Sequence, residues 1–192
     1  MFINMLSEEK KVLLIELAKL LSLSNSPFLW DGKTKEELTS DSDLSKLSIQ
    51  RTELETKLLE ELGHYTSPRS YPLIGIYEHD WHTATEKRLI EKLKAFPLAK
   101  IDAPESRVQA ATAVLRSLLE AKKTDALAEP KIVIFQLFLF SLRAGQISSI
   151  EWMLLKEIQL HYHLPDFIFK DLLNSAEALN SEMNKTLALI LE

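Results

Sequence analysis

The chain has 192 residues, of which 46% are hydrophobic and 27% are charged, and its formal net charge at pH 7 is −5. A chain of this length buries about 70% of the surface that its unfolded form exposes, so a single domain can fold without a disulfide or a structural metal. The four glycines and seven prolines argue against a turn-rich β-sandwich and a glycine-rich nucleotide fold, and the lack of cysteine excludes disulfides, thiolate zinc sites and thiol nucleophiles.

The start of the chain and its charge balance bear on location and partners. Residues 1–6 are apolar but lack the basic segment of a signal peptide, and charged residues follow from Glu8 onward, so we expect a cytoplasmic protein. The most apolar run, residues 132–142, is far shorter than the roughly 20 residues of a transmembrane helix, so no transmembrane segment is expected. The 23 basic residues against 28 acidic ones provide no basic surface for phosphate, so nucleic acid is not an expected partner.

Periodic leucines predict two helices in the first third of the chain. The first helix begins at Ser7, and its leucines recur at spacings of three and four, which defines an apolar stripe. The second covers residues 49–62 and ends at Gly63, which we expect to form a left-handed cap. Residues 22–48 are predicted to be a polar connection with a short helix near Glu36.

Residues 64–82 lose the helical period, because Pro68, Pro72 and Gly75 interrupt them. They are predicted to form one long irregular loop. Loops of this length inside a compact domain are usually functional or mobile. A lid that packs over the core is the alternative, since aromatic and aliphatic residues are frequent in this segment.

Helical periodicity resumes after this loop. It predicts helices at residues 84–95, 104–122, 130–142, 149–162, 165–174 and 176–191. Four capping boxes, in which a capping side chain precedes a Glu by three positions, support a helical chain: Thr34 with Glu37, Thr83 with Glu86, Asp102 with Glu105, and Ser148 with Glu151. We therefore expect an all-α fold, a single compact domain over residues 1–192 with about seven or eight helices in helix-turn-helix pairs.

A strand is the alternative for residues 132–142, because isoleucine, valine and phenylalanine also favour strands. Pro130 at the expected start of this segment and Gly145 after its end favour a helix. The phenylalanines of this helix and the aromatic residues of the next two are expected to fill the core, and an exposed partner groove is the alternative.

Residues 132–173 carry a helix, a glycine turn, a capped helix, a Leu-Pro turn and another helix in the predicted order. The residues that define this pattern are Gly145, Ile147, Ser148, Glu151, Leu154, Leu155, Ile158, Leu164, Pro165 and Phe169. The segment resembles the repeat of the TerB-like tellurite-resistance family, whose helix pairs meet at an Asp-Gly-x-Ile-Ser-x-x-Glu turn. Ala144 stands where the family has Asp, so no acidic or metal role is carried over to it. A degenerate second copy is predicted at the turn that contains Asp31 and Gly32.

The resemblance implies an all-helical stress-response protein, associated with metal or oxyanion resistance and without a demonstrated enzymatic mechanism. The chain also lacks a Walker loop, a Gly-x-Ser-x-Gly elbow and an HExxH motif. We therefore expect a non-enzymatic protein without a cofactor. Its expected action is protein–protein interaction, as an adaptor or as an immunity-type binder.

His79, Asp80 and His82 are the candidate metal ligands. Two imidazoles and a carboxylate suit a divalent ion such as zinc. The local sequence offers no further protein ligand, and loop residues that precede a helix are the simpler interpretation. A metal-binding module, or a metal-dependent helical enzyme that uses this region, is the alternative function.

Overall fold

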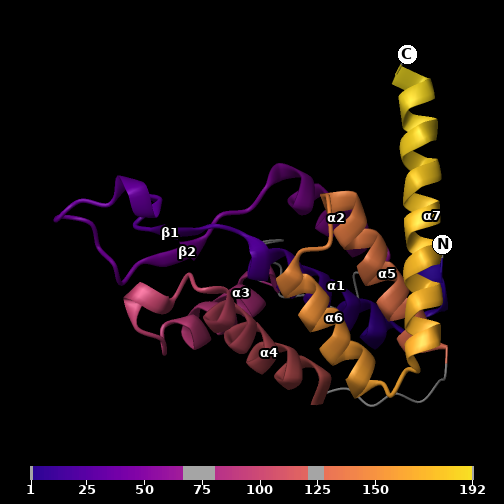
Figure 1. The fold of residues 1–192 in the computed structure, drawn as a ribbon, viewed down its shortest axis with the longest axis horizontal. Coiled ribbons are helices and arrows are strands. Elements are labelled where there is room, and N and C mark those ends of the chain that lie inside the picture. Colours follow the sequence, from indigo (N-terminus) through magenta and orange to yellow (C-terminus); the bar gives the residue numbers. More distant parts are fainter. Residues whose placement is uncertain (1, 67–80, 121–127, 192) are drawn as a thin grey trace.

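Seven α-helices surround a common apolar core in the computed structural model of the chain, which describes residues 2–66, 81–120 and 128–191 (Figure 1). The helices are α1 (Glu8–Asn25), α2 (Glu53–Gly63), α3 (Trp81–Leu93), α4 (Pro104–Glu120), α5 (Glu129–Ala144), α6 (Ser149–His161) and α7 (Asp166–Leu191). The expected all-α, compact single-domain fold is confirmed. Among the described residues, no helix combines the length and the apolar character that crossing a membrane requires.

Helix α1 is the centre of the fold, because it packs against α2, α3, α4, α5 and α6. Its side chains are buried on nearly every face, not only along the predicted leucine stripe. The predicted start is confirmed, since the Ser7 hydroxyl accepts a hydrogen bond from the Lys10 N–H. At its other end, the guanidinium group of Arg107 on α4 donates to the carbonyls of Ser24 and Ser26, which is a favourable place for a cation at a helix C-terminus.

A short antiparallel hairpin replaces much of the polar connection predicted for residues 22–48. Strands β1 (Phe28–Trp30) and β2 (Leu47–Ile49) pair, and the hairpin extends from the body on the side opposite to α7 (Figure 1). The predicted short helix is present as a 3-10 turn, Lys35–Glu37, whose capping box with Thr34 is formed. The hairpin escaped prediction because each strand has only three residues, too few for alternation to be visible in the sequence.

The second predicted helix begins later than expected, although it ends at Gly63 as predicted. Residues 47–49 form β2, and α2 starts at Glu53 behind a capping box of Thr52 with Glu55 that the sequence analysis did not identify. The left-handed cap expected at Gly63 is wrong, because the helix continues through this residue and its C-terminal cap, His64, is itself helical.

Two of the four predicted capping boxes are displaced. Helix α3 already includes Thr83, which therefore does not precede the helix. Helix α4 starts at Pro104, so the position before it belongs to Ala103, and the carboxylate of Asp102 instead accepts a hydrogen bond from Arg107 Nε at 3.2 Å. Proline is favoured at the first helical position, which explains the shift.

Helix α7 is a single helix of 26 residues, so the predicted division into 165–174 and 176–191 is wrong. Ser175 is a weak helix former, but its hydroxyl donates to the Asp171 carbonyl at 2.7 Å, which accommodates it within the helix. Ala176 follows and is fully buried against the body. Packing therefore overrides the local weakness at this position.

The turn between α5 and α6 agrees with the sequence analysis. Residues 132–142 are helical, Gly145 ends α5 with φ +150°, and the capping box of Ser148 with Glu151 starts α6. The degenerate second copy is different, because Asp31 and Gly32 form a tight turn in which Trp30 and Lys33 exchange backbone hydrogen bonds, and no α-helix follows. Of these two turns, the Gly145 turn therefore joins two α-helices and the Gly32 turn does not.

Replacing Gly145 with valine is expected to destabilise the fold by about 1 to 2 kcal/mol. A side chain is strained at this positive φ, although no atom lies within 4 Å of the position that a Cβ would take. Ala144→Asp is the control and is expected to change the free energy of unfolding little. Urea denaturation of both variants measures the difference, and an unchanged midpoint for Gly145→Val would show that the turn tolerates ordinary residues.

Candidate functional site

Helix α7 changes its surroundings midway along its length. Its first half packs on α5, where Phe169 and Phe138 are fully buried with their rings edge to face at 5.0 Å. Asn180 Nδ2 donates to the carbonyl of Leu142 at 3.4 Å, near the C-terminal end of α5. The C-terminal part of α7 projects from the body (Figure 1). Every described side chain from residue 181 onward is exposed.

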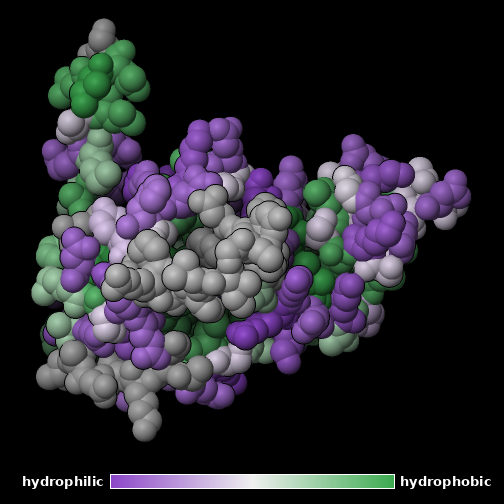
Figure 2. Space-filling view, turned by 180° about the vertical axis from the view of Figure 1, so that it is seen from behind, coloured by the Kyte–Doolittle hydropathy of each residue, from purple (hydrophilic) through white to green (hydrophobic). Residues whose placement is uncertain are grey.

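The apolar face of α7 does not end where its packing ends. Leu179, Met183, Leu187 and Ile190 recur at spacings of three and four, so they continue along the face that Phe169 and Ala176 bury in the first half of the helix. We call these four residues the α7 stripe. Their side chains are between 42% and 73% exposed. Figure 2 shows the hydrophobic surface at the free end of α7.

One ion pair accompanies this stripe. Glu182 and Lys185 pair at 2.7 Å along the helix; the helical spacing of 100° per residue places Lys185 on the side opposite to the stripe, whereas Glu182 lies at its flank. They are the only charged residues between 179 and 191, so this segment carries no net charge. The α7 stripe is therefore an apolar surface flanked by an ion pair.

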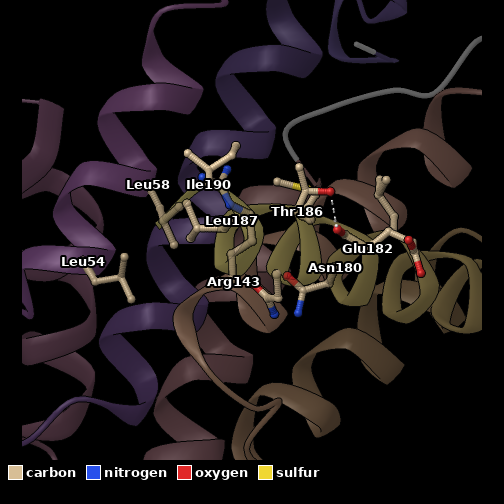
Figure 3. A pocket seen from close by; sticks show the side chains of 11 residues that line it. Leu54, Leu58, Arg143, Asn180, Glu182, Thr186, Leu187 and Ile190 are labelled. Atoms are coloured by element: carbon tan, nitrogen blue, oxygen red, sulfur yellow. Dashed lines mark hydrogen bonds between the residues drawn. The ribbon is translucent and has the colours of Figure 1, made fainter. Parts of the chain in front are cut away.

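The α7 stripe forms one wall of a groove. The other walls are Leu54 and Leu58 of α2 and Arg143 of α5, and the cavity between them has a volume of about 600 Å³ (Figure 3). A second cavity of about 330 Å³ continues between α2, α5 and the 3-10 turn Phe2–Met5. The two share the following residues: Leu58, Arg143, Leu179 and Met183. We treat them as one feature, the α2–α5–α7 groove.

Polar side chains of α7 also line the groove, namely Asn180, Glu182, Asn184 and Thr186, and further polar groups lie at its edge and at its base. At the edge, the Arg143 guanidinium donates to both carboxylate oxygens of Glu61, at 2.7 and 3.2 Å, and so joins α5 to α2. At the base, Gln136 is buried, and its Nε2 has no hydrogen-bond partner in the described part of the chain. Buried amide groups are normally paired, so an acceptor from a bound molecule would complete this site.

A buried polar cluster lies at the contact of α1, α3 and the segment before α2. The Thr85 hydroxyl donates to the carboxylate of Glu16, and Arg51 pairs with Glu86. Lys19 lies on α1 beside these groups and is only 1% exposed. Burial lowers the pKa of Lys19 from its ordinary value of 10.5 to about 8; Glu16 opposes this shift and Arg51 adds to it.

This cluster has a structural role in the present geometry. Perturbed lysines often mark functional sites. The Lys19 ammonium, however, is closed off from solvent, so a substrate could not reach it without a rearrangement. The cluster instead ties the central helix to α3 and to the start of α2.

The predicted metal ligands cannot be assembled from the described residues. His79 and Asp80 lie outside them, and for His82 only its backbone position in α3 is described. Among the residues that the structure describes, no group of three or more His, Asp or Glu side chains could hold a metal ion.

Added Zn²⁺ is expected to leave the melting temperature unchanged at pH 7.5. Two imidazoles and one carboxylate within four consecutive residues cannot readily surround a tetrahedral ion. A real site would raise the melting temperature at pH 7.5 and raise it less at pH 5.5, where imidazoles with a pKa of about 6.5 are protonated. Thermal melts of the wild type, His79→Ala and His82→Ala check this, and a zinc-dependent rise that both substitutions abolish would establish the metal site instead.

Sequence reasoning located only part of the groove. The expectation of a filled core is confirmed for Phe138, Phe140 and Phe169, whereas Phe167 is exposed. The stripe on α7 has a readable period, but the predicted break near residue 175 separated it from the buried half of the same helix. The opposite wall could not be predicted, because more than 100 residues separate Leu54 from Leu187.

Comparison of the chain with known protein families, with curated proteins and with solved structures finds no match.

Proposed function

We propose that the protein is a non-enzymatic interaction module that binds an apolar helix of a protein partner in the α2–α5–α7 groove. One observation carries the proposal: the apolar face of α7 is buried in the first half of the helix and continues, uncovered by the described residues, through the second half. Large contiguous apolar surfaces of this kind mark interaction sites.

The shape of the groove favours a helical occupant. Its walls are themselves helices, and its apolar groups repeat with the helical period along α7. Helices bind such grooves through side chains at positions i, i+3, i+4 and i+7. An apolar segment that also offers one acceptor would satisfy Gln136 at the base of the groove.

The energetics of docking favour an apolar partner. Full burial of a leucine or methionine contributes about 1.5 to 3 kcal/mol, so covering each half-exposed side chain of the α7 stripe contributes on the order of 1 kcal/mol. The charged groups at the edge are already paired, as Arg143 is with Glu61. A charged partner would therefore gain little from them.

The resemblance to the TerB-like family belongs to the same proposal. The Gly145 turn and the Ser148–Glu151 capping box support it locally. Under this proposal the protein is a cytoplasmic stress-response adaptor or immunity-type binder, related to tellurite resistance through that family. A chain without cysteine is also suited to a reducing compartment.

Site-specific photo-crosslinking in the cells that make the protein tests the groove. A benzophenone side chain at Leu187 lies in the groove, and one at Lys185 lies on the opposite face of the same helix. We expect irradiation to give a discrete protein adduct from position 187 and none from position 185. Equal labelling at the two positions, or no adduct at position 187, would contradict a docking role for the groove.

A further inference from the structure

We propose that the helix bound in the groove is α7 of a second copy of this chain, so that two copies associate about a twofold axis through their α7 helices. This inference rests on the proposed function, since it names the partner of the same groove. In such a dimer the projecting half of each α7 lies against the α7 stripe and against Leu54 of the other copy.

The chain itself contains a helix of the kind that the groove requires. The projecting segment of α7 is apolar along one face, and its last residues, Leu187 to Leu191, contain no charged group. Thirteen residues from Leu179 to Leu191 span about 20 Å, and α2, which supplies Leu54 and Leu58 to the facing wall, spans about 16 Å over its 11 residues. The projecting segment is therefore comparable in length to the helix that faces it.

The geometry is self-complementary. The same residues of α7 form a wall of the groove and supply the apolar helix that would fill it. A twofold dimer requires one surface that binds its own copy, with each contact made twice. Antiparallel packing of the two α7 helices provides such a surface.

The available area meets the need of a dimer. The exposed parts of the α7 stripe, with Leu54 and Leu191, amount to roughly 600 Å² per copy, so two copies would bury on the order of 1,200 Å². Stable interfaces bury about 1,200 to 2,000 Å² in total. A patch of this size lies at the upper end of what monomeric proteins expose.

Charge favours a second copy as well. The whole chain carries −5, whereas the segment from 179 to 191 carries one Glu and one Lys, paired with each other. Two copies of this segment can therefore meet without repulsion between like charges. On α2, Glu61, which lines the groove, is paired with Arg143 of α5 at 2.7 Å.

Sedimentation equilibrium of the full chain tests the inference. The wild type is expected to reach twice the 22.0 kDa of one chain. The double variant Met183→Glu, Leu187→Glu is expected to remain monomeric, with dimerisation weakened at least 100-fold, because it places two carboxylates in the apolar contact.

A matched double variant on α6, Met153→Glu with Leu160→Glu, controls for added charge. Both side chains are exposed, and neither lines the groove. We expect it to dimerise like the wild type, with an unchanged helical circular dichroism spectrum in all three proteins. A monomeric wild type at millimolar concentration, or a dimer that the α6 variant breaks and the α7 variant does not, would overturn the inference.

The photo-crosslink at Leu187 separates this inference from the proposed function. An adduct of twice the chain mass supports the second copy. An adduct of another mass, with the chain monomeric, overturns the dimer and leaves the groove as a docking site for a different protein. No adduct at all overturns both.

Discussion

Replacing Phe138 with alanine is expected to lower the free energy of unfolding by about 3 to 5 kcal/mol. The side chain is fully buried in α5, and its ring packs edge to face against Phe169 of α7. Alanine would leave a cavity at the contact that holds the first half of α7 to the body, and the surrounding helices could close it only in part.

Urea denaturation at a fixed, low protein concentration measures this loss, since self-association would otherwise change the apparent stability. Phe167→Ala is the control, because the same residue type is 64% exposed on the first turn of α7. It is expected to change the stability by less than about 0.5 kcal/mol. Equal losses for the two substitutions would contradict the described packing of α5 on α7.

Lys19 is expected to make the stability of the fold rise with pH above neutrality. Its folded-state pKa of about 8 lies below the ordinary value of 10.5, because burial disfavours the ammonium form. Between these two values the unfolded chain binds more protons than the folded chain, so the contribution of this group to stability increases as pH rises. The increase between pH 7 and pH 10 is about 2 kcal/mol.

The variant Lys19→Met isolates this contribution, because methionine is of similar length and does not titrate. Its stability is expected to lack this pH dependence, because the methionine side chain binds no proton in either state. The difference in unfolding free energy, wild type minus variant, is then expected to grow by about 2 kcal/mol up to pH 10. A constant difference across this range would mean that Lys19 keeps an ordinary pKa in the folded protein.

Helix positions were largely predictable from the sequence, since apolar period and capping chemistry are local. The Ser7 and Ser148 caps show this, because each satisfies backbone groups within three residues of itself. The features that the sequence analysis missed depend on contacts between residues that are distant in the sequence. The continuity of α7 through Ser175 depends on the burial of Ala176, and the hairpin depends on pairing between Phe28 and Ile49, which are 21 residues apart.

The groove was beyond prediction for the same reason. The sequence presents the α7 stripe as an ordinary amphipathic helix, which would be expected to bury its apolar face. Only the fold shows that α5 ends at Ala144 and leaves the second half of α7 facing Leu54 and Leu58 across an open groove. The candidate metal ligands were predicted from the sequence, but the structure does not test them, because His79 and Asp80 lie outside the described residues.

The accessibility of the Met183 methyl group tests the docking role of the α7 stripe most directly. The chain has four methionines, so methyl-labelled protein gives few signals, and Met153 on α6 serves as an internal reference. The two side chains are similarly exposed in the single chain, at 42% for Met183 and 51% for Met153. A soluble paramagnetic agent should broaden both signals in dilute protein. As the protein concentration rises, the Met183 methyl group is expected to become protected from the agent while the Met153 methyl group remains accessible. If both methyl groups stay equally accessible at every protein concentration, and also after addition of an extract of the cells that make the protein, the result would contradict the docking role of the α7 stripe.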